Sequence, residues 1–236
     1  MFWGISLKNK LITCSILLLT LLLLPNISNA NTCNNKTEIN TCVQVFVKSK
    51  TGQELGDLVV YLEPLDGQVL DKSHKEVVVG QRDKSFTPYI TVSQTNSKVN
   101  FVNQDNITHH IYSAESENKF SFKIRAGTTH SLTQFDQANE IAMGCNIHDW
   151  MSGYLLVVNT PYFDKTDELG QVSFNLAKKG KYKVVVWHPQ MQAENNRMIM
   201  EQDITKHNTF TFTLKNELES IPTQESDDDF EFLSDY

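Results

Sequence analysis

The feature that most restricts the fold is a series of short segments in which apolar and polar residues alternate between turn-forming Gly, Asn, Asp and Ser. The first segment, residues 43–47, is followed by a turn at 50–53 and an apolar run at 58–62. An alternation of period two is typical of β-strands, whose successive side chains point to opposite faces. The same pattern predicts strands at 85–92, 98–102, 110–113, 119–124, 155–159, 171–176, 181–187 and 209–214. With only a short helical turn suggested at 194–202, the chain is predicted to be all-β, a sandwich or barrel.

The first thirty residues have the layout of a secretory signal. Lys8 and Lys10 precede a mostly apolar run at 11–24, and Ser28-Asn29-Ala30 provides small residues for cleavage. A membrane span needs about 20 apolar residues, so this run is too short to be one. We therefore expect residues 1–30 to be removed, which leaves no membrane span and a periplasmic or otherwise secreted protein.

The cysteines that remain after cleavage differ in their expected roles. In an oxidising compartment Cys33 and Cys42 can close a disulfide loop in an N-terminal segment at 31–42. That pairing leaves Cys145 as an odd thiol. A free thiol in an exported protein needs an explanation, and metal binding is a good one.

The charge distribution excludes one class of partner. The full chain has a net charge of −7, but residues 217–236 contain eight acidic residues and neither Lys nor Arg. The rest of the chain is nearly neutral, which argues against nucleic acid as a partner. Residues 216–236 are predicted to form a disordered acidic tail, which serves either as a solubilising end or as a docking arm for a basic partner.

Residues 144–151 combine three metal-binding side chains in a short stretch. Cys145, His148 and Met151 offer a thiolate, an imidazole and a thioether within seven residues. Copper that alternates between Cu(I) and Cu(II) is bound by one Cys and two His, with a weak axial Met. The pattern therefore predicts a mononuclear copper site that needs one more histidine from elsewhere in the chain.

Two adjacent histidines upstream can supply that ligand. His109 and His110 follow Phe101-Val-Asn103, and His109 lies six residues after Asn103. Because alternate side chains of a strand point to opposite faces, only one of the two should bind the metal. His109 is the favoured ligand, and His110 is the alternative.

The two motifs together resemble those of cupredoxins such as plastocyanin and amicyanin, over about residues 80–159. Cys145, His148 and Met151 match the Cys-x-x-His-x-x-Met of amicyanin at the same spacing. The resemblance implies a Greek-key sandwich that holds one type 1 copper ion. It also implies that Cys145 is the thiolate ligand, that His109 and His148 are the imidazole ligands, and that Met151 is the axial ligand.

Further segments widen the resemblance. His109-His110-Ile-Tyr-Ser, the segment at 159–163 and Val186-Trp-His-Pro189 are similar to the cupredoxin-type proteins labelled methylamine utilisation proteins. The flanks at 43–65 and 160–215 are similar to carboxypeptidase regulatory-like, transthyretin-type sandwiches. Because neither flank has enough strands to stand alone, we expect one small sandwich with the cupredoxin domain (80–159) inserted in it. A single enlarged sandwich is the alternative.

These features predict an exported type 1 (blue) copper protein that carries single electrons to and from an unidentified redox partner protein. It is expected to be a carrier and not an enzyme. The alternative is an extracytoplasmic copper-binding or storage protein, or a non-redox β-sandwich binding module. An enzyme with Cys145 as nucleophile and His148 as base is disfavoured, because it leaves Met151 without a role.

Overall fold

The computed structural model describes residues 1, 41–71, 75–114, 117–205 and 208–225. Apart from Met1, the predicted signal peptide lies outside these ranges, as do Cys33 and residues 226–236. Cleavage of the signal and the Cys33–Cys42 disulfide therefore stay predictions. In the described part of the chain, no helix has both the length and the apolar character to cross a membrane.

The described residues are all-β, as predicted from the sequence. Their elements are β1 (Thr41–Lys48), β2 (Val59–Pro64), β3 (Val77–Arg82), β4 (Ser85–Thr87), β5 (Ile90–Gln94), β6 (Val99–Asn103), β7 (His109–Ser113), β8 (Phe120–Ile124), β9 (Thr129–Leu132), β10 (Asn139–Cys145), β11 (Ser152–Val158), β12 (Phe163–Lys165), β13 (Gln171–Leu176), β14 (Gly180–Trp187), the 3₁₀ helix η1 (Glu194–Asn196), β15 (Arg197–Ile204) and β16 (Asn208–Thr213). The helical turn suggested at 194–202 is wrong beyond η1, because β15 pairs along its whole length with β14.

The two ends of the described chain meet in one body, here called the flanking unit (β1, β2 and β12–β16). One sheet has the order β13-β1-β16 and the other has the order β12-β2-β14-β15. β1 pairs antiparallel with β13, and β2 pairs antiparallel with β14, although well over a hundred residues of sequence separate the strands of each pair. Alternate apolar residues of both sheets fill the core between them, including Val45, Leu62 and Val184.

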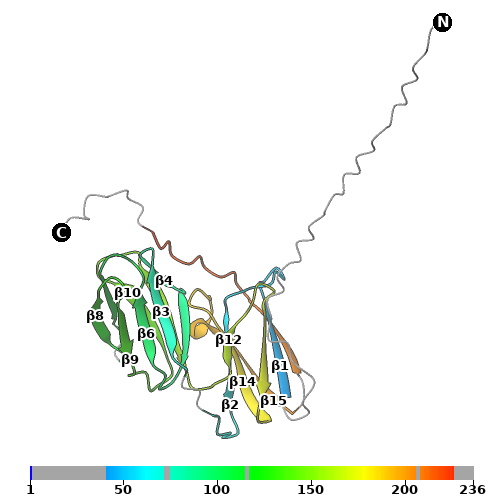
Figure 1. Ribbon diagram of the computed structural model, residues 1–236. Helices are drawn as coiled ribbons and strands as arrows, with labels where there is room; N and C mark the ends of the chain where they lie inside the picture. Colours follow the sequence, from blue (N-terminus) through cyan, green and yellow to red (C-terminus); the bar gives the residue numbers. More distant parts are fainter. Residues whose placement is uncertain (2–40, 72–74, 115–116, 206–207, 226–236) are drawn as a thin grey trace.

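The strands between these ends form a second body, the central unit (β3–β11), which lies beside the flanking unit in Figure 1. Its sheets have the orders β5-β11-β10-β7-β8 and β4-β3-β6-β9. The core between them contains Phe101, Ile111, Phe135 and Leu155, and it also contains Cys145. The predicted metal-binding segments thus all belong to one two-sheet sandwich.

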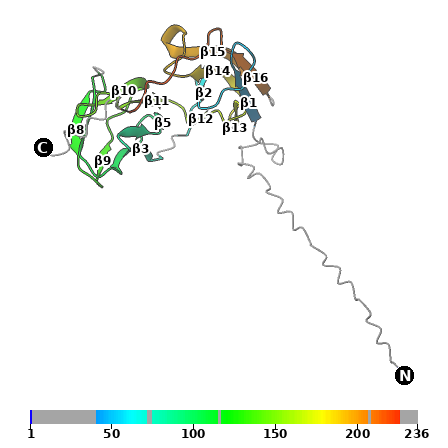
Figure 2. The same cartoon turned by 90° about the horizontal axis from the view of Figure 1, so that it is seen from above.

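Strands β2, β11 and β14 are each buried on both faces, and this joins the two units. In β2 and β14, Leu62 and Val184 face the core of the flanking unit, whereas Tyr61 and Val185 contribute to a separate cluster. In β11, Leu155 faces the core of the central unit, whereas Leu156 belongs to the same separate cluster as Tyr61 and Val185. A strand that is covered on both faces has a nearly continuous run of apolar residues in its sequence, and these strands show that pattern. The view from above shows the two bodies side by side (Figure 2).

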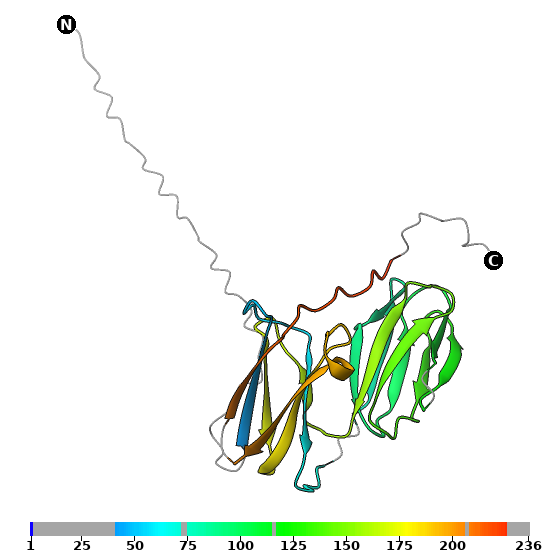
Figure 3. The ribbon, with the colours of Figure 1, turned by 180° about the vertical axis from the view of Figure 1, so that it is seen from behind.

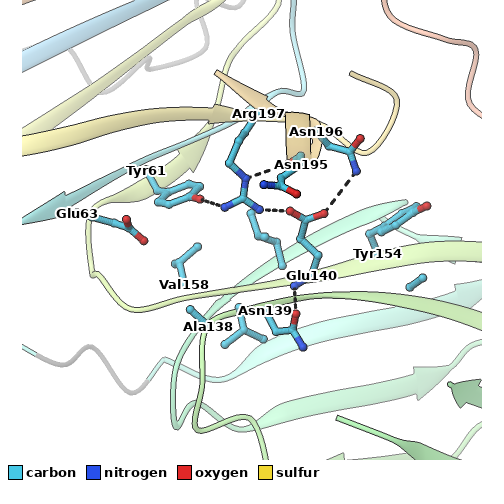
Figure 4. A pocket seen from close by; sticks show the side chains of 13 residues that line it. Tyr61, Glu63, Ala138, Asn139, Glu140, Tyr154, Val158, Asn195, Asn196 and Arg197 are labelled. Atoms are coloured by element: carbon cyan, nitrogen blue, oxygen red, sulfur yellow. Dashed lines mark hydrogen bonds and ion pairs between the residues drawn. The ribbon is translucent and has the colours of Figure 1, made fainter. Parts of the chain in front are cut away.

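A polar contact lies next to this apolar junction. Arg197 of β15 forms an ion pair with Glu140 of β10, and Arg197 also donates a hydrogen bond to the hydroxyl of Tyr61 at 3.1 Å. These side chains line a cavity of about 600 Å³ between the units, which Figure 4 shows from close by. Asn196 of η1 adds a 3.5 Å hydrogen bond to the other oxygen of Glu140.

The C-terminal segment links the units a second time. After β16, the chain runs from the flanking unit to the central unit (Figure 3, brown to red). Leu214 is buried in the flanking core, whereas Gln224 forms hydrogen bonds with Ser152 in the central unit. Gln224, which lies in the predicted acidic tail (216–236), therefore makes defined contacts with the central unit.

Candidate metal centre

The three strongest candidate ligands meet at one end of the central sandwich. His109 is the first residue of β7, and Cys145 is the last residue of the neighbouring strand β10. The antiparallel register places Cys145 opposite Ile111, two residues from His109 on the same face of β7. His148 lies in the loop that connects β10 to β11. Strand pairing thus brings together residues that are far apart in the sequence.

The geometry of the three side chains suits a single metal ion. Sγ of Cys145 lies 3.6 Å from Nδ1 of His148 and 3.9 Å from Nδ1 of His109. The ligand atoms all lie within 4.8 Å of one another, and the three residues are buried. Bonds of about 2.0–2.3 Å to one ion would hold such atoms roughly 3.5–4 Å apart. The donor set therefore fits one ion without large movement.

Met151 belongs to the same buried region. It is 1% exposed and packs in the cluster that contains Cys145. Its backbone N–H donates a 3.0 Å hydrogen bond to the carbonyl of His148, which tightens the loop. The start of the loop is held by Asn146, whose N–H donates to the carbonyl of His110 at 2.9 Å. Both ends of the loop are thus fixed by backbone hydrogen bonds.

His109 and His110 point to opposite sides of β7. Inward positions alternate along the strand, so His109 is fully buried whereas His110 is only partly buried. Nε2 of His110 lies 2.9 Å from Oγ of Ser121, and its Nδ1 lies 3.4 Å from the amide of Asn146. The alternative ligand is therefore placed outside the cluster, and the favoured one is placed inside it.

Asn103 shapes the turn that leads to His109. Its amide donates to the carbonyls of Ile107 and Ile124 at 2.7 and 3.2 Å. Its Oδ1 accepts a 2.9 Å hydrogen bond from the backbone N–H of Asp105. These contacts explain why an Asn stands six residues before the histidine, since it holds the loop between β6 and β7.

Asp105 is a site residue that sequence reasoning missed. Its Oδ2 lies 2.8 Å from Nε2 of His109, the ring nitrogen that faces away from Cys145. Burial opposes ionisation of Asp105, but hydrogen bonds from His109, Lys84 and Asp83 outweigh it and lower the pKa of the carboxyl. No local motif marks this residue, because its role depends on the fold of the loop.

The electrostatics of the metal-free site favour a thiolate. Burial opposes ionisation of Cys145, yet hydrogen bonds from His109 and from the backbone N–H groups of 147, 110 and 148 together lower its pKa. Burial and the neighbouring His109 lower the pKa of His148, which favours the neutral ring. Burial also opposes protonation of His109, but Cys145 and Asp105 outweigh it and raise the pKa. Thiolate and neutral imidazole are the forms that bind metals, so the shifts of Cys145 and His148 favour binding, whereas a protonated His109 would release its proton on binding.

The loop also offers an exposed apolar edge. Ile147 is 49% exposed, and the ring of Trp150 lies 5.3 Å from the ring of His148, centroid to centroid. The rings of His148 and His109 are 5.0 Å apart. His148 is thus the candidate ligand that connects the buried cluster to the exposed part of the loop.

Comparisons with known proteins give structural likeness only. No family model and no curated protein matches the chain. A Cu-containing nitrite reductase (NirK) from Thermus scotoductus SA-01 is 22% identical over 41% of this chain, at a TM-score of 0.34. A purple cupredoxin from Nitrosopumilus maritimus is 16% identical and an oxidised amicyanin variant 17% identical, each over 35% of this chain, at TM-scores of 0.32 and 0.33.

The matches differ in how much of the other protein they cover. The chain spans 25% of the nitrite reductase, but 99% of the purple cupredoxin and 81% of the amicyanin variant.

Proposed function

We propose that this chain is an exported type 1 copper protein that carries single electrons between redox partners and is not an enzyme. The observation that supports this proposal most is the buried cluster of one cysteine and two histidines, whose ligand atoms lie within 4.8 Å of one another. A copper ion bound there would supply one-electron exchange. Cys145 is the free cysteine of the described residues, and its ionisation is favoured by its surroundings.

Each side chain has a role in this proposal. Cys145 provides the thiolate, and His109 and His148 provide imidazole nitrogens through Nδ1. Met151 would be the additional weak ligand, since it is buried in the same core cluster as Cys145 and lies at the end of the loop. Two strands and a tightly bonded loop hold these groups before any metal binds. Such preorganisation lets the oxidation state change with little movement of the protein.

The exposed part of the loop is the proposed route for electrons. His148 lies between the buried cysteine and the ring of Trp150, and Ile147 gives the adjacent surface an apolar character. A redox partner protein that contacts this surface would reach the edge of the imidazole of His148. The partner is unidentified.

The remaining parts of the proposal concern the setting. We propose that residues 1–30 direct export to the periplasm or beyond and that Cys33 and Cys42 form a disulfide. We interpret the flanking unit as a transthyretin-type sandwich interrupted by a cupredoxin domain. The pairing of β1 with β13 and of β2 with β14 supports this interpretation. We also propose that the chain is of the methylamine utilisation protein type, on the basis of segments such as His109-His110-Ile-Tyr-Ser and Val186-Trp-His-Pro189.

The test is a visible absorption spectrum of the full chain after addition of Cu(II). An intense thiolate-to-copper band is expected, and Cys145→Ser should abolish it. Met151→Leu should shift the band and the reduction potential. Met143→Leu is the matched control, because Met143 is buried in the same cluster but lies outside the loop. A colourless protein that binds copper weakly would contradict electron transfer and favour the copper-binding or non-redox binding module.

A further inference from the structure

The carboxylate of Asp105 is held by three donors. Its Oδ1 accepts a 2.6 Å hydrogen bond from the backbone N–H of Asp83, and its Oδ2 accepts one from Lys84 at 3.1 Å. The same Oδ2 lies 2.8 Å from Nε2 of His109. The side chain of Asp105 is 10% exposed, and that of His109 is fully buried. The carboxylate therefore lies between a backbone turn and a candidate metal ligand.

The turn that holds Asp105 has a fixed geometry. Asp83 and Lys84 connect β3 to β4, and both have positive φ, 53° and 56°. Two central residues with positive φ define the type I′ turn that is common in two-residue hairpins. The N–H groups of both residues donate to Asp105. On the other side, the backbone of Asp105 is bonded to Asn103, so the carboxylate is positioned independently of His109.

This arrangement determines which nitrogen of His109 is available for a metal. An ionised carboxylate only accepts hydrogen bonds, so its contact with Nε2 favours a proton there and leaves Nδ1, which faces Cys145, as the nitrogen that a metal ion would bind. In the described part of the chain, no carboxylate makes an equivalent ion pair with His148. Of the two histidines in the cluster, His109 is thus held by a carboxylate, whereas no carboxylate of the described residues holds His148 in this way.

We propose that Asp105 is a positioning residue that fixes the ring proton of His109 on Nε2 and strengthens its Nδ1 as a donor to Cu(II). The proposal rests on the function proposed above. A carboxylate bonded to a ligand histidine fixes the orientation of the ring and increases its basicity. It also adds a negative charge near the site. Both effects stabilise the doubly charged ion more than the singly charged one, so Asp105 lowers the reduction potential.

The test compares two variants that each remove one carboxylate near the site. Asp105→Asn removes the charge that contacts His109, whereas Asp149→Asn removes an exposed charge next to His148 in the sequence. Loss of a carboxylate behind a metal ligand typically weakens metal binding about 10- to 100-fold. We expect that loss for Cu(II) in Asp105→Asn and a smaller loss for Cu(I). Each tenfold by which the loss of Cu(II) affinity exceeds the loss of Cu(I) affinity raises the reduction potential by about 59 mV. Asp149→Asn should stay within about threefold of wild type for Cu(II) binding.

A measurement on the metal-free protein separates this inference from the proposed function. ¹⁵N chemical shifts of neutral His109 report which nitrogen carries the proton. We expect Nε2–H in the wild type and a mixture of tautomers in Asp105→Asn, with melting temperatures of the metal-free variants confirming that they fold. If wild type shows no blue band, the proposed function fails and the NMR result still decides the role of Asp105. An unchanged tautomer, or an unchanged potential with a lower melting temperature, would show that Asp105 only holds the hairpin turn.

Discussion

Gln224 and Ser152 are joined by two hydrogen bonds across 72 residues of sequence. Oε1 of Gln224 accepts from the backbone N–H of Ser152 at 3.1 Å, and its Nε2 donates to the Ser152 hydroxyl at 3.0 Å. The carbonyl of Gln224 also accepts from the hydroxyl of Ser85 at 3.1 Å. Because Ser152 directly follows Met151, the C-terminal segment is attached to the end of the candidate metal-binding loop.

Replacing Gln224 should therefore loosen the loop. Gln224→Ala removes the two partly buried hydrogen bonds to Ser152, together with an exposed one to the carbonyl of Pro222, which should lower the free energy of unfolding by about 1–2 kcal/mol. Hydrogen exchange of the backbone amides at 146–152 should also become faster. Gln192→Ala is the matched control, since its amide bonds at 3.1 Å to the exposed Glu219. Equal effects of both substitutions in denaturant titrations and exchange would contradict an anchoring role for Gln224.

The Glu140–Arg197 ion pair is expected to couple the two units. Both side chains are about three-quarters buried, at 23% and 27% exposure, and Arg197 also bonds to Tyr61. Glu140→Gln leaves a partly buried guanidinium without its counter-charge, so we expect a loss of about 1–3 kcal/mol of unfolding free energy. Adding Arg197→Gln should cost less than the sum of the single changes, which a double-mutant cycle measures.

The exposed pair Lys98–Glu76 provides the reference cycle. Its atoms are 3.1 Å apart, but the side chains are 42% and 57% exposed. Solvent screens exposed ion pairs so that they contribute little, and the coupling energy should therefore be small there. A coupling energy for Glu140–Arg197 no larger than that of Lys98–Glu76 would show that the apolar cluster alone holds the units together.

The all-β class and the core of the site could be predicted because their signals are local. Period-two alternation identifies strands, and the spacing of Cys145, His148 and Met151 lies within one loop. β10 was missed because Ala142 and Gly144 interrupt its apolar pattern, and its strand conformation comes from pairing with β7 and β11. Residues 197–202 contain good helix formers, but pairing with β14 overrides this preference.

The role of Asp105 could not be predicted, because its partners come from a hairpin turn in another part of the sheet. Asp83 and Lys84 approach it only when β3 lies parallel to β6. The junction between the units could not be predicted either, because it also depends on contacts between distant segments. An apolar run such as 58–62 shows that both faces of the strand are covered, but it does not show what covers them. Contacts between distant segments were thus the unpredictable part of both fold and site.

Gly144 leaves room for the ring of Tyr112 directly beside Cys145. A Cβ at Gly144 would lie 2.9 Å from three atoms at the far end of that ring, which faces it across the β7–β10 pair. Gly144→Ala should therefore displace the ring or the strand and cost about 1–3 kcal/mol of unfolding free energy, with a shifted thiolate-to-copper band. The double variant Gly144→Ala with Tyr112→Leu should recover stability and band position. If the double variant does not recover stability and band position, a clash with the ring of Tyr112 is not the cause of the loss.

His188 gives the protein a specific sensitivity to acid. It is 4% exposed, and burial lowers its pKa to about 4, whereas a histidine in an unfolded chain has a pKa of about 6.5. Between these pH values the unfolded chain binds a proton that the folded chain does not, so stability falls as the pH decreases from about 6.5 to 4. The full loss is on the order of 3 kcal/mol. His188→Gln keeps an acceptor for the N–H of Gln190, which Nδ1 of His188 accepts at 3.2 Å. Urea titrations should show the advantage of wild type over this variant shrinking on acidification, and parallel pH profiles for the two proteins would contradict the prediction.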